Sequence, residues 1–353
     1  MVEISWFAAL CDDDTALLGV PDLERVSSWE HCLAIVLEAE RQGFDSILLP
    51  SGYELGIDSV AFAAAAASAT TKIRLLLAVR IGEMWPPQLA RQLATIDQIA
   101  AGRLDVNIIS SPLPGELLES AARYARTEEA MAILAALLSG DPVNHHGVNY
   151  DLEVEPPRIA RDRARRPPFY FGGLSEEALG VAARASDVYL MWPDTLDRVE
   201  ALVADMKGRA RAVGRTIHVG YRVHVIVRET EHEARAAATH LLSALEPDVG
   251  EQLRARSLDA ASTGVARQSG LRDLADDEGY VDGNLFTGIG RARSGCGAAI
   301  VGNPEQVVAY LRELERRGID AVILSGYPHI DEAKQFGELV LAQLDHAPIS
   351  PTP

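Results

Sequence analysis

Lysine is almost missing from this chain, which carries only Lys72, Lys207 and Lys334. The 33 lysine and arginine residues are outnumbered by 51 aspartate and glutamate residues, so the net charge is −18. A surface this acidic repels phosphate backbones, and we do not expect nucleic acid as a partner. A small anionic substrate stays compatible with the sequence, because a local group of arginines can reverse the sign of the field at one site.

Cysteine and long apolar runs are also scarce. Three cysteines in 353 residues form no disulfide framework and fit a reducing compartment. The first residues, MVEISWFAALCDDD, have no basic region ahead of their apolar stretch and do not resemble a signal peptide. Apolar stretches such as residues 60–69 are too short to cross a membrane. We therefore expect a cytoplasmic protein without a membrane partner.

Several motifs that carry chemistry are missing as well. His145 and His146 are adjacent and would point apart, and Cys296 is isolated, so no group has the spacing of metal ligands. Neither a G-x-S-x-G elbow nor a P-loop occurs. The sequence thus predicts no metal centre, and it does not favour a serine hydrolase or a P-loop enzyme.

The chain does contain a recurring unit, in which a short apolar run precedes an amphipathic stretch. The composition is that of an ordinary globular protein, with 48% apolar and 24% charged residues. Strands are predicted at 3–10, 44–50, 72–80, 103–110, 169–173, 187–192, 216–230 and 320–329. Helices are predicted at 27–43, 58–69, 87–102, 124–139, 175–185, 195–213, 303–318 and 331–344, with a further one after Thr230.

Turn and cap residues support several of these boundaries. Ser27 with Glu30, and Thr230 with Glu233, have the spacing of capping boxes, and Asn303 stands ahead of a helix as its cap. The strands are continuous apolar runs, which indicates a parallel sheet covered on both faces. Eight such units predict a (β/α)8 barrel, taken as one domain over 1–353 with insertions at about 140–168 and 246–297. An open doubly wound sheet is the alternative, although no G-x-G-x-x-G follows the first strand.

In a barrel, functional residues gather where the strands end. FGGLSEEA (171–178) places a glycine pair before the start of a helix, where free N–H groups attract a phosphate. The alternative is a tight turn with Ser175 as a plain helix cap. Arg222 and His224 are two apart on one strand and share a face, and an arginine in an apolar strand is costly unless it meets an anion. The alternative there is a buried ion pair with a core histidine.

Two later segments add to these residues. Arg291 and Arg293 lie in the glycine-rich stretch GIGRARSGCG (288–297), where most arginines are solvated. Tyr327 and His329 follow the last strand in SGYPH, and both are able to handle protons, although a plain turn explains the glycine and proline. The residues alone therefore predict a barrel enzyme with an anion site and a phosphate-bearing ligand.

Taken together, these segments resemble the bacterial luciferase-like flavin-dependent monooxygenases, and more narrowly the alkanesulfonate monooxygenase family. The likeness runs from ISWF (4–7) to the end of the last predicted strand. Its specific stretches are ARQLATIDQIAAGR (90–103), PPFYFGG (167–173), YRVHVIVRET (221–230), GIGRARSGCGAAIVG (288–302) and LSGYPH (324–329).

The resemblance implies an activity and its partners. Reduced FMN would come from a separate NAD(P)H-dependent flavin reductase, O2 would be the co-substrate, and an organosulfonate would be split into sulfite and an aldehyde. The family likeness also implies a homodimer or homotetramer. Because the oxygenated flavin decays in water, a lid must dry the site, and the 246–297 segment is our candidate for it.

The resemblance also assigns residues. Arg222, Arg293, His224 and Tyr327 correspond to the group around the sulfonate, with Trp192 lining the pocket and His329 beside the substrate. The FMN phosphate corresponds to Gly173, Leu174 and Ser175 with Tyr124, and the flavin ring to the region of Arg80 and Asn107.

The chain departs from the family after strands two and three. The family's Pro-Thr-Gly and cysteine are replaced by PSGYELGID (50–58), with Tyr53 and Glu54, and the next loop adds Glu83 and Trp85. Carboxylates and aromatic rings suit a hydroxylated ligand, so we hypothesise a sugar sulfonate, with sulfoquinovose giving 6-oxo-glucose. The alternatives are a simple alkanesulfonate, a deazaflavin-dependent oxidoreductase and a non-catalytic flavin-binding protein.

Overall fold

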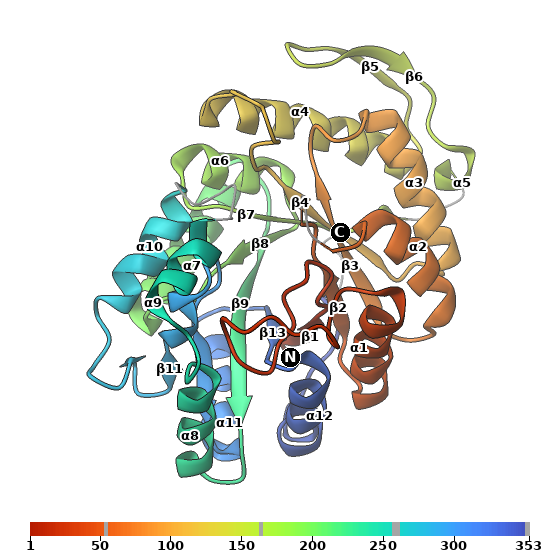
Figure 1. Cartoon of the computed structure of the whole chain (residues 1–353). Helices are drawn as coiled ribbons and strands as arrows, with labels where there is room; N and C mark the ends of the chain where they lie inside the picture. The colour runs from red at the N-terminus through yellow and green to blue at the C-terminus, as the bar shows by residue number, and fades with distance from the viewer. Residues whose placement is uncertain (53–55, 162–164, 256–261, 350–353) are drawn as a thin grey trace.

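A closed barrel of eight parallel strands forms the centre of the computed structural model, which describes residues 1–52, 56–161, 165–255 and 262–349 (Figure 1). The ring runs in the order β9, β13, β1, β2, β3, β4, β7, β8, and β8 pairs with β9 to close it. The strands are β1 (Glu3–Phe7), β2 (Ser46–Leu49), β3 (Arg74–Arg80), β4 (Leu104–Ile109), β7 (Phe169–Gly172), β8 (Val188–Met191), β9 (His218–Val227) and β13 (Ala321–Ser325). The predicted (β/α)8 barrel is therefore confirmed.

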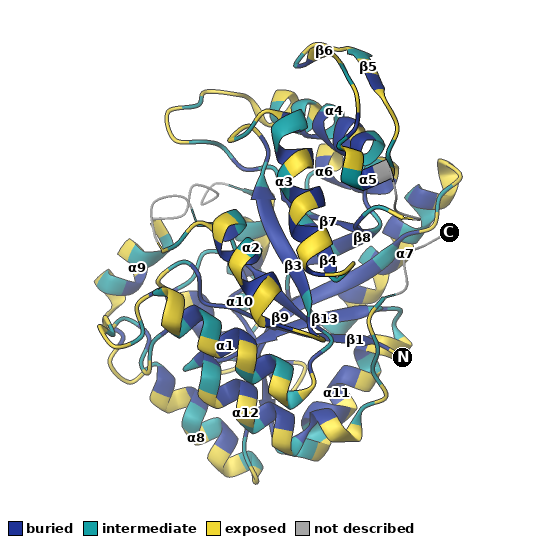
Figure 2. Ribbon diagram, turned by 90° about the vertical axis from the view of Figure 1, so that its right-hand side faces the viewer, coloured by how far each residue is buried: buried dark blue, intermediate teal, exposed yellow. Residues whose placement is uncertain are grey.

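Helices surround this ring, and Figure 2 shows their buried sides turned toward it. They are α1 (Trp29–Gln42), α2 (Ser59–Ala69), α3 (Pro86–Ile99), α4 (Ser120–Ser139), α6 (Glu176–Ala185), α7 (Leu196–Ala212), α8 (Glu231–Leu241), α11 (Pro304–Arg316) and α12 (His329–Leu339). Each predicted helix is present, with ends shifted by a few residues. No helix in the described part of the chain is both long and apolar enough to span a membrane.

The local signals at helix starts were mostly right. Capping boxes form at Thr230 with Glu233 and at Asn303 with Gln306, and Ser175 caps α6 by accepting from the Ala178 N–H. The predicted capping box of Ser27 with Glu30 is wrong, because Ser28 caps α1. The Ser27 hydroxyl instead donates to the Ala9 carbonyl at 2.6 Å and holds the loop after β1.

The two insertions contain more regular structure than their composition suggests. The first carries the hairpin β5 (Val143–His146) and β6 (Asp151–Val154), then the short helix α5 (Arg158–Arg161). The second, for which the sequence predicted no helix or strand, contains α9 (Pro247–Ala255) and α10 (Thr263–Arg272). The short elements β10 (Tyr280–Val281), β11 (Leu285–Phe286) and η1 (Gly288–Arg291) complete it.

Strand β9 is longer than its neighbours because two strands pair with it one after the other along one edge. Residues His218–Tyr221 pair there with β8 and His224–Val227 with β12 (Ala299–Gly302), while Gly220–His224 pair with β13 on the other edge. The pairing with β12 carries the segment just before β12 to the carboxyl end of the barrel. Arg293 and Cys296 therefore arrive beside His224.

The inside of the barrel changes in character along its axis. Glu3 and Asp105 lie buried at the amino end, and the middle is filled by an apolar group. That group consists of Phe7, Leu48, Leu76, Ala78, Tyr170, Val188 and Ile323. Polar side chains follow at the carboxyl end, where Arg222, His224 and Ser325 contact one another. The apolar middle thus forms the floor of a polar mouth.

Candidate active site

Arg222 and His224 both reach Ser325 from the adjacent strand β9, as expected for two residues on one face. The Arg222 Nη2 donates to the Ser325 hydroxyl at 2.7 Å, and Nη1 donates to the Val223 carbonyl at 2.8 Å. The guanidinium stands 4.4 Å from the centre of the Phe7 ring. Arg222 is buried, with 7% of its surface exposed, and burial lowers its pKa. Among the described residues no carboxylate pairs with it, so the ion-pair alternative is not supported.

Both ring nitrogens of His224 have partners. Nε2 lies 3.2 Å from the Cys296 carbonyl oxygen, which only accepts, so Nε2 carries the proton. Nδ1 lies 2.6 Å from the Ser325 hydroxyl, which can donate to it. Burial first, and then the charges of Arg222 and Arg293, lower the pKa of His224 well below its ordinary value. His224 is therefore a neutral imidazole held between two fixed groups.

Arg293 is paired where Arg222 is not. Its Nη1 lies 3.1 Å from Asp13 Oδ2 and also donates to the Tyr327 hydroxyl. Burial opposes its charge, but Tyr327 and Asp13 outweigh burial, so the pKa of Arg293 is raised. The Tyr327 ring stacks on His224 at a centroid distance of 5.2 Å, and burial raises its pKa. The phenol of Tyr327 keeps its proton and can donate a hydrogen bond to a ligand.

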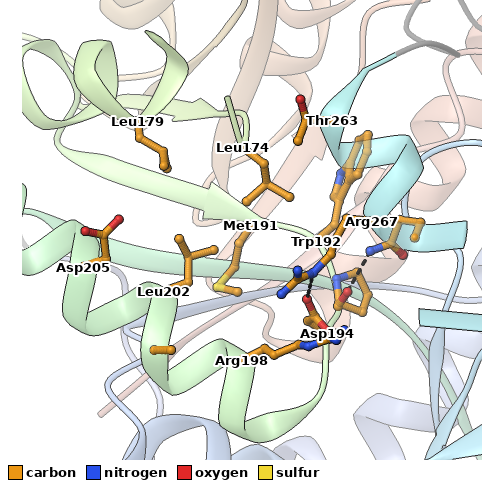
Figure 3. Close-up of a pocket in the computed structure, with 13 residues that line it drawn as sticks. Leu174, Leu179, Met191, Trp192, Asp194, Arg198, Leu202, Asp205, Thr263 and Arg267 are labelled. Atoms are coloured by element: carbon orange, nitrogen blue, oxygen red, sulfur yellow. Dashed lines mark hydrogen bonds and ion pairs between the residues drawn. The ribbon is translucent and has the colours of Figure 1, made fainter. Parts of the chain in front are cut away.

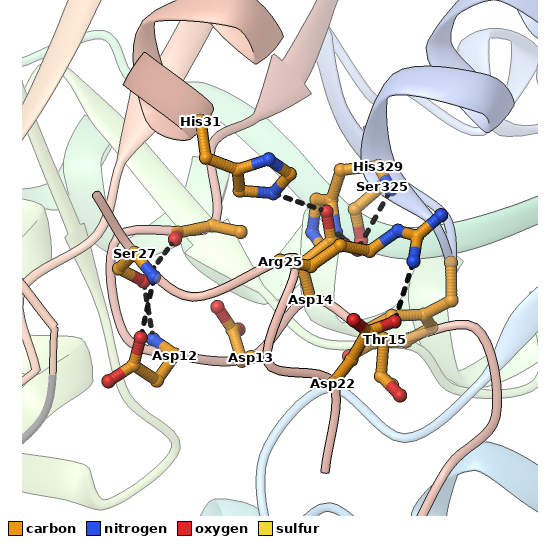
Figure 4. Close-up of polar contacts among 12 residues, drawn as sticks. Asp12, Asp13, Asp14, Thr15, Asp22, Arg25, Ser27, His31, Ser325 and His329 are labelled. Carbon is orange, nitrogen blue, oxygen red and sulfur yellow. Dashed lines mark hydrogen bonds and ion pairs between the residues drawn. The ribbon is translucent and has the colours of Figure 1, made fainter. Parts of the chain in front are cut away.

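Asp14 links the start of helix α12 to helix α1 (Figure 4). Its Oδ1 accepts from the His329 N–H at 3.0 Å and lies 2.9 Å from His329 Nδ1. Its Oδ2 lies 2.9 Å from His31 Nε2. His329 is 1% exposed, and its Nε2 has no partner among the described residues.

Three of the buried polar side-chain atoms that lack a partner among the described residues belong to this mouth. In the described part of the chain, Asp13 Oδ1, Arg80 Nε and His329 Nε2 are buried without a hydrogen-bond partner. Buried polar groups are satisfied in most native structures, and exceptions point to a missing ligand or water. The mouth therefore offers one acceptor carboxylate, one guanidinium donor and one imidazole nitrogen to a bound molecule.

The turn after β7 has the geometry of an anion cradle. Gly173 has φ +144°, and a Cβ there would lie 2.6 Å from the Ala178 Cβ and 3.2 Å from the Tyr124 hydroxyl. Ser175 follows as the cap of α6, and its hydroxyl accepts from the Ala178 N–H at 3.2 Å. Leu174 faces the neighbouring pocket. The predicted phosphate residues and Tyr124 are therefore brought together.

Trp192 borders a pocket of about 340 Å3 between helices α7 and α10 (Figure 3). Leu174, Met191 and Arg267 also line it. A Cβ on Gly295 would lie 3.2 Å from the Trp192 ring, so the tryptophan also contacts the segment that carries Arg293. Trp192 thus stands between this pocket and the arginine cluster.

Two comparisons with known proteins agree about this chain. The model of the family "Luciferase-like monooxygenase" matches residues 3–321. The chain belongs to this family. It is 58% identical to a sulfoquinovose monooxygenase of Novosphingobium aromaticivorans over 355 aligned positions, which cover 99% of this chain and 98% of that protein. It is 49% identical to a sulfoquinovose monooxygenase of Agrobacterium fabrum, covering 97% of this chain and 89% of that protein.

Solved structures agree on the fold of this luciferase-like chain. A riboflavin lyase, solved with modified FMN and riboflavin, superposes with a TM-score of 0.78, covering 100% of this chain and 94% of the other. The sequence identity is 17%, so this likeness concerns the fold alone.

The residues at the mouth of this luciferase-like barrel fit a reduced flavin. A phosphate fits the Gly173 turn, where a side chain would fill the space ahead of the start of α6. The Arg80 side chain donates to Ser111 and to the Ser51 carbonyl, which leaves its buried Nε without a partner. Asn107 is half-buried on β4, opposite Ala78 of β3. Arg80 and Asn107 thus lie on neighbouring strands, as expected for a flavin ring in that region.

Of the predicted substrate residues, Trp85 stands apart from this group. Trp85 is 53% exposed and contacts the Tyr150 ring at 5.5 Å, edge to face. None of the contacts of the described residues links Trp85 to the arginine cluster. Tyr53 and Glu54 lie outside the described residues.

Sequence reasoning missed Asp13, Asp14 and Ser325. A signal was present for the first two, because three consecutive aspartates follow the first predicted strand at the functional end of the barrel. No group of three or more His, Cys, Asp or Glu residues in the described ranges has the geometry of a metal site.

Proposed function

We propose that this chain is a two-component monooxygenase that uses reduced FMN and O2 to cleave the C–S bond of sulfoquinovose. The products are sulfite and 6-oxo-glucose. The names of the two relatives, at 58% and 49% identity, support the substrate, and the family match supports the reaction class. We further propose that a separate NAD(P)H-dependent flavin reductase supplies the reduced FMN and that the chain forms a homo-oligomer.

The buried guanidinium of Arg222 carries this proposal. A buried charge without a counterion is costly, so it points to an anion that arrives with the ligand. A sulfonate is negatively charged at every accessible pH and offers three oxygens to a forked donor. Arginine suits it because its charge is permanent and its N–H groups lie in one plane. The ligand sulfonate would supply the negative charge that the protein does not.

Asp13 supports a hydroxylated substrate. Its Oδ2 pairs with Arg293, while its Oδ1 is buried without a partner. A sugar carries hydroxyl donors close to its sulfonate, and a simple alkanesulfonate carries none. An acceptor left unpaired in the complex costs about 1–3 kcal/mol, so Asp13 would favour the sugar.

The remaining residues have roles that follow from their protonation. Bound reduced flavin supplies the two electrons with which O2 is split, one oxygen atom going to the sulfonate-bearing carbon and the other to water. His224 is neutral and held on both sides. Its Nε2–H can donate to a ligand only if its hydrogen bond to the Cys296 carbonyl breaks. Tyr327 keeps its proton and donates a hydrogen bond, while Arg293 holds its phenol in place. Trp192 and the segment around Gly295 would exclude water, in keeping with the lid function proposed for residues 246–297.

Sulfite release tests the proposal directly. The full chain is supplied with regenerated FMNH2 and air, and sulfite is measured with sulfoquinovose and with octanesulfonate in parallel. We expect sulfite from sulfoquinovose, and a loss of about 100-fold in kcat/KM for Arg222→Gln. Sulfite from octanesulfonate alone would contradict the sugar assignment. No sulfite and no oxygen uptake with either substrate would overturn the reaction class and favour deazaflavin chemistry.

A further inference from the structure

Three side chains at the mouth are able to handle protons, and their surroundings differ. His224 has partners on both ring nitrogens. Tyr327 has a raised pKa, and its oxygen already accepts from Arg293. His329 alone of the three has a bare nitrogen, because Nε2 is buried with no partner among the described residues. A proton acceptor needs such a free lone pair.

Asp14 determines which nitrogen of His329 is bare. A carboxylate only accepts hydrogen bonds, so the 2.9 Å contact between Asp14 Oδ1 and Nδ1 places a proton on Nδ1. Burial opposes the charge of Asp14, but the bonds from His329 outweigh burial and hold the pKa of Asp14 below its ordinary value. His31 contacts the second oxygen at 2.9 Å and fixes the carboxylate from the other side. His329 therefore has the opposite tautomer to His224, whose proton is on Nε2.

Asp14 also changes how well His329 can hold a positive charge. His329 is the first residue of α12, and the start of a helix disfavours a cation. An ionised carboxylate in contact with the ring orients it and stabilises an imidazolium that forms during the reaction, as in other aspartate–histidine pairs. The aromatic rings of Phe7 and Tyr327 pack against the imidazole, with centroid distances of 5.9 Å and 5.3 Å.

We propose that Asp14 is a positioning residue, which holds His329 so that its Nε2 takes a proton from the substrate. This inference rests on the proposed function. After one oxygen atom has been inserted, the sulfonate-bearing carbon carries a hydroxyl group. The C–S bond then breaks, its electron pair leaves on sulfite, the carbon–oxygen bond becomes a carbonyl, and the hydroxyl proton passes to Nε2. Charge balances, because the imidazolium and the dianionic sulfite together replace a neutral imidazole and a monoanionic substrate.

A structural alternative explains the same carboxylate. Asp14 accepts from the His329 N–H at 3.0 Å and so could serve only as a cap of α12. Asp14→Asn separates the two roles, because an asparagine oxygen still caps the helix but carries no charge. The titratable groups near His329 are Asp14 in direct contact, His31 behind Asp14, Tyr327 against its ring and His224.

The test follows the pH dependence of sulfite release from sulfoquinovose by the full chain. For Asp14→Asn we expect kcat to fall about 100-fold with KM changed less than threefold. The acid limb of the kcat profile should move to lower pH, because loss of the carboxylate disfavours the imidazolium. Asp22→Asn is the matched control, since Asp22 lies in the same loop and pairs with Arg25 at the surface. Unchanged kcat and an unmoved acid limb for Asp14→Asn would overturn the proposal.

A second variant and a second measurement cover the other outcomes. If Asp14→Asn does not fold, His329→Gln decides, because glutamine cannot take a proton, and full kcat would refute the step. The 15N resonances of the histidines report the tautomer without substrate, and we expect the His329 ring to carry its proton on Nδ1. If the wild type releases no sulfite, the proposed function and the proton step both fail, and the 15N spectrum still decides whether Asp14 positions His329.

Discussion

The two arginines at the mouth of the barrel differ in their neighbours. Arg222 is buried beside the Phe7 ring and bonds only to carbonyls and to Ser325 among the described residues. Arg293 has a carboxylate neighbour in Asp13 and is tied to Tyr327. Arg222 is therefore open to an external anion, while Arg293 joins a network that a substrate must enter without disrupting it. The Ser325 hydroxyl bonds to both Arg222 and His224, so a substitution at either residue alters the hydrogen bonding of the other.

Asp13 gives a prediction about specificity at the scale of one residue. In Asp13→Asn, the preference for sulfoquinovose over octanesulfonate, as the ratio of kcat/KM values, should fall about tenfold. The reason is that the buried acceptor for a sugar hydroxyl is weakened, whereas an alkyl chain never used it. Parallel sulfite assays with both substrates measure the ratio, with Asp22→Asn as the control. An equal loss for both substrates would mean that Asp13 serves only to hold Arg293.

At the scale of elements, the candidate site depends on the turns that follow the strands and on how the strands pair. The turn between β7 and α6 needs a residue without a side chain, because Gly173 has φ +144° and closely approaches Ala178 and Tyr124. The pairing of the second half of β9 with β12 brings the Arg293 segment to the mouth. Helix α10 covers Trp192, since a Cβ on Gly264 would lie 2.9 Å from that ring.

Gly173→Ala tests the turn as a flavin phosphate cradle. We expect the dissociation constant for FMN to rise at least about tenfold, because the new methyl group forces the backbone away from positive φ and displaces the Tyr124 hydroxyl. Titration of flavin fluorescence measures this. Gly208→Ala in α7 is the control, since a Cβ there meets no atom within 4 Å. Unchanged FMN affinity in Gly173→Ala would place the phosphate elsewhere.

At the scale of the whole molecule, the chain closes its own barrel. The Ile349 N–H donates to Glu3 Oε2 at 2.8 Å, so the last described residues cover the amino end of the strands. Glu3 Oε1 accepts from the Ser5 hydroxyl at 2.9 Å. Burial first, and then the charge of Asp105, raise the pKa of Glu3 to about 7. The candidate active site lies at the opposite end of the barrel, so we expect this carboxyl to affect stability rather than that site.

Glu3 makes the stability of the fold depend on pH. Because the pKa of Glu3 is raised from 4.5 to about 7 on folding, its contribution is complete below pH 4.5 and is lost as the pH rises to 7. Glu3→Gln should therefore be more stable than the wild type at pH 8, by on the order of 3 kcal/mol, and about equal to it near pH 4.5. Urea unfolding at the two values measures the difference. Glu24→Gln, at an exposed glutamate, should show no such dependence, and the same stability difference at both values would contradict the assignment.

The sequence by itself determined the strands, most of the helix caps and the shared face of Arg222 and His224, because each depends on neighbours a few residues away. A strand alternates its side chains every two residues, and an apolar run without alternation is buried on both sides. The resemblance to the luciferase-like family was also available from sequence, and the family match confirms it.

Only the tertiary structure decided which groups meet. Asp13 and Arg293 are 280 residues apart, and Asp14 and His329 are 315 apart, so no local pattern relates them. The helices of the second insertion were missed because they are short and polar, and packing against η1 and Trp192 stabilises them. Trp85 was expected near the substrate but contacts Tyr150 of the first insertion, which is 65 residues away in the sequence. Barrel closure brings distant strand ends together. Only in the closed barrel does Arg293 meet the carboxylate of Asp13, while Arg222 meets no carboxylate among the described residues.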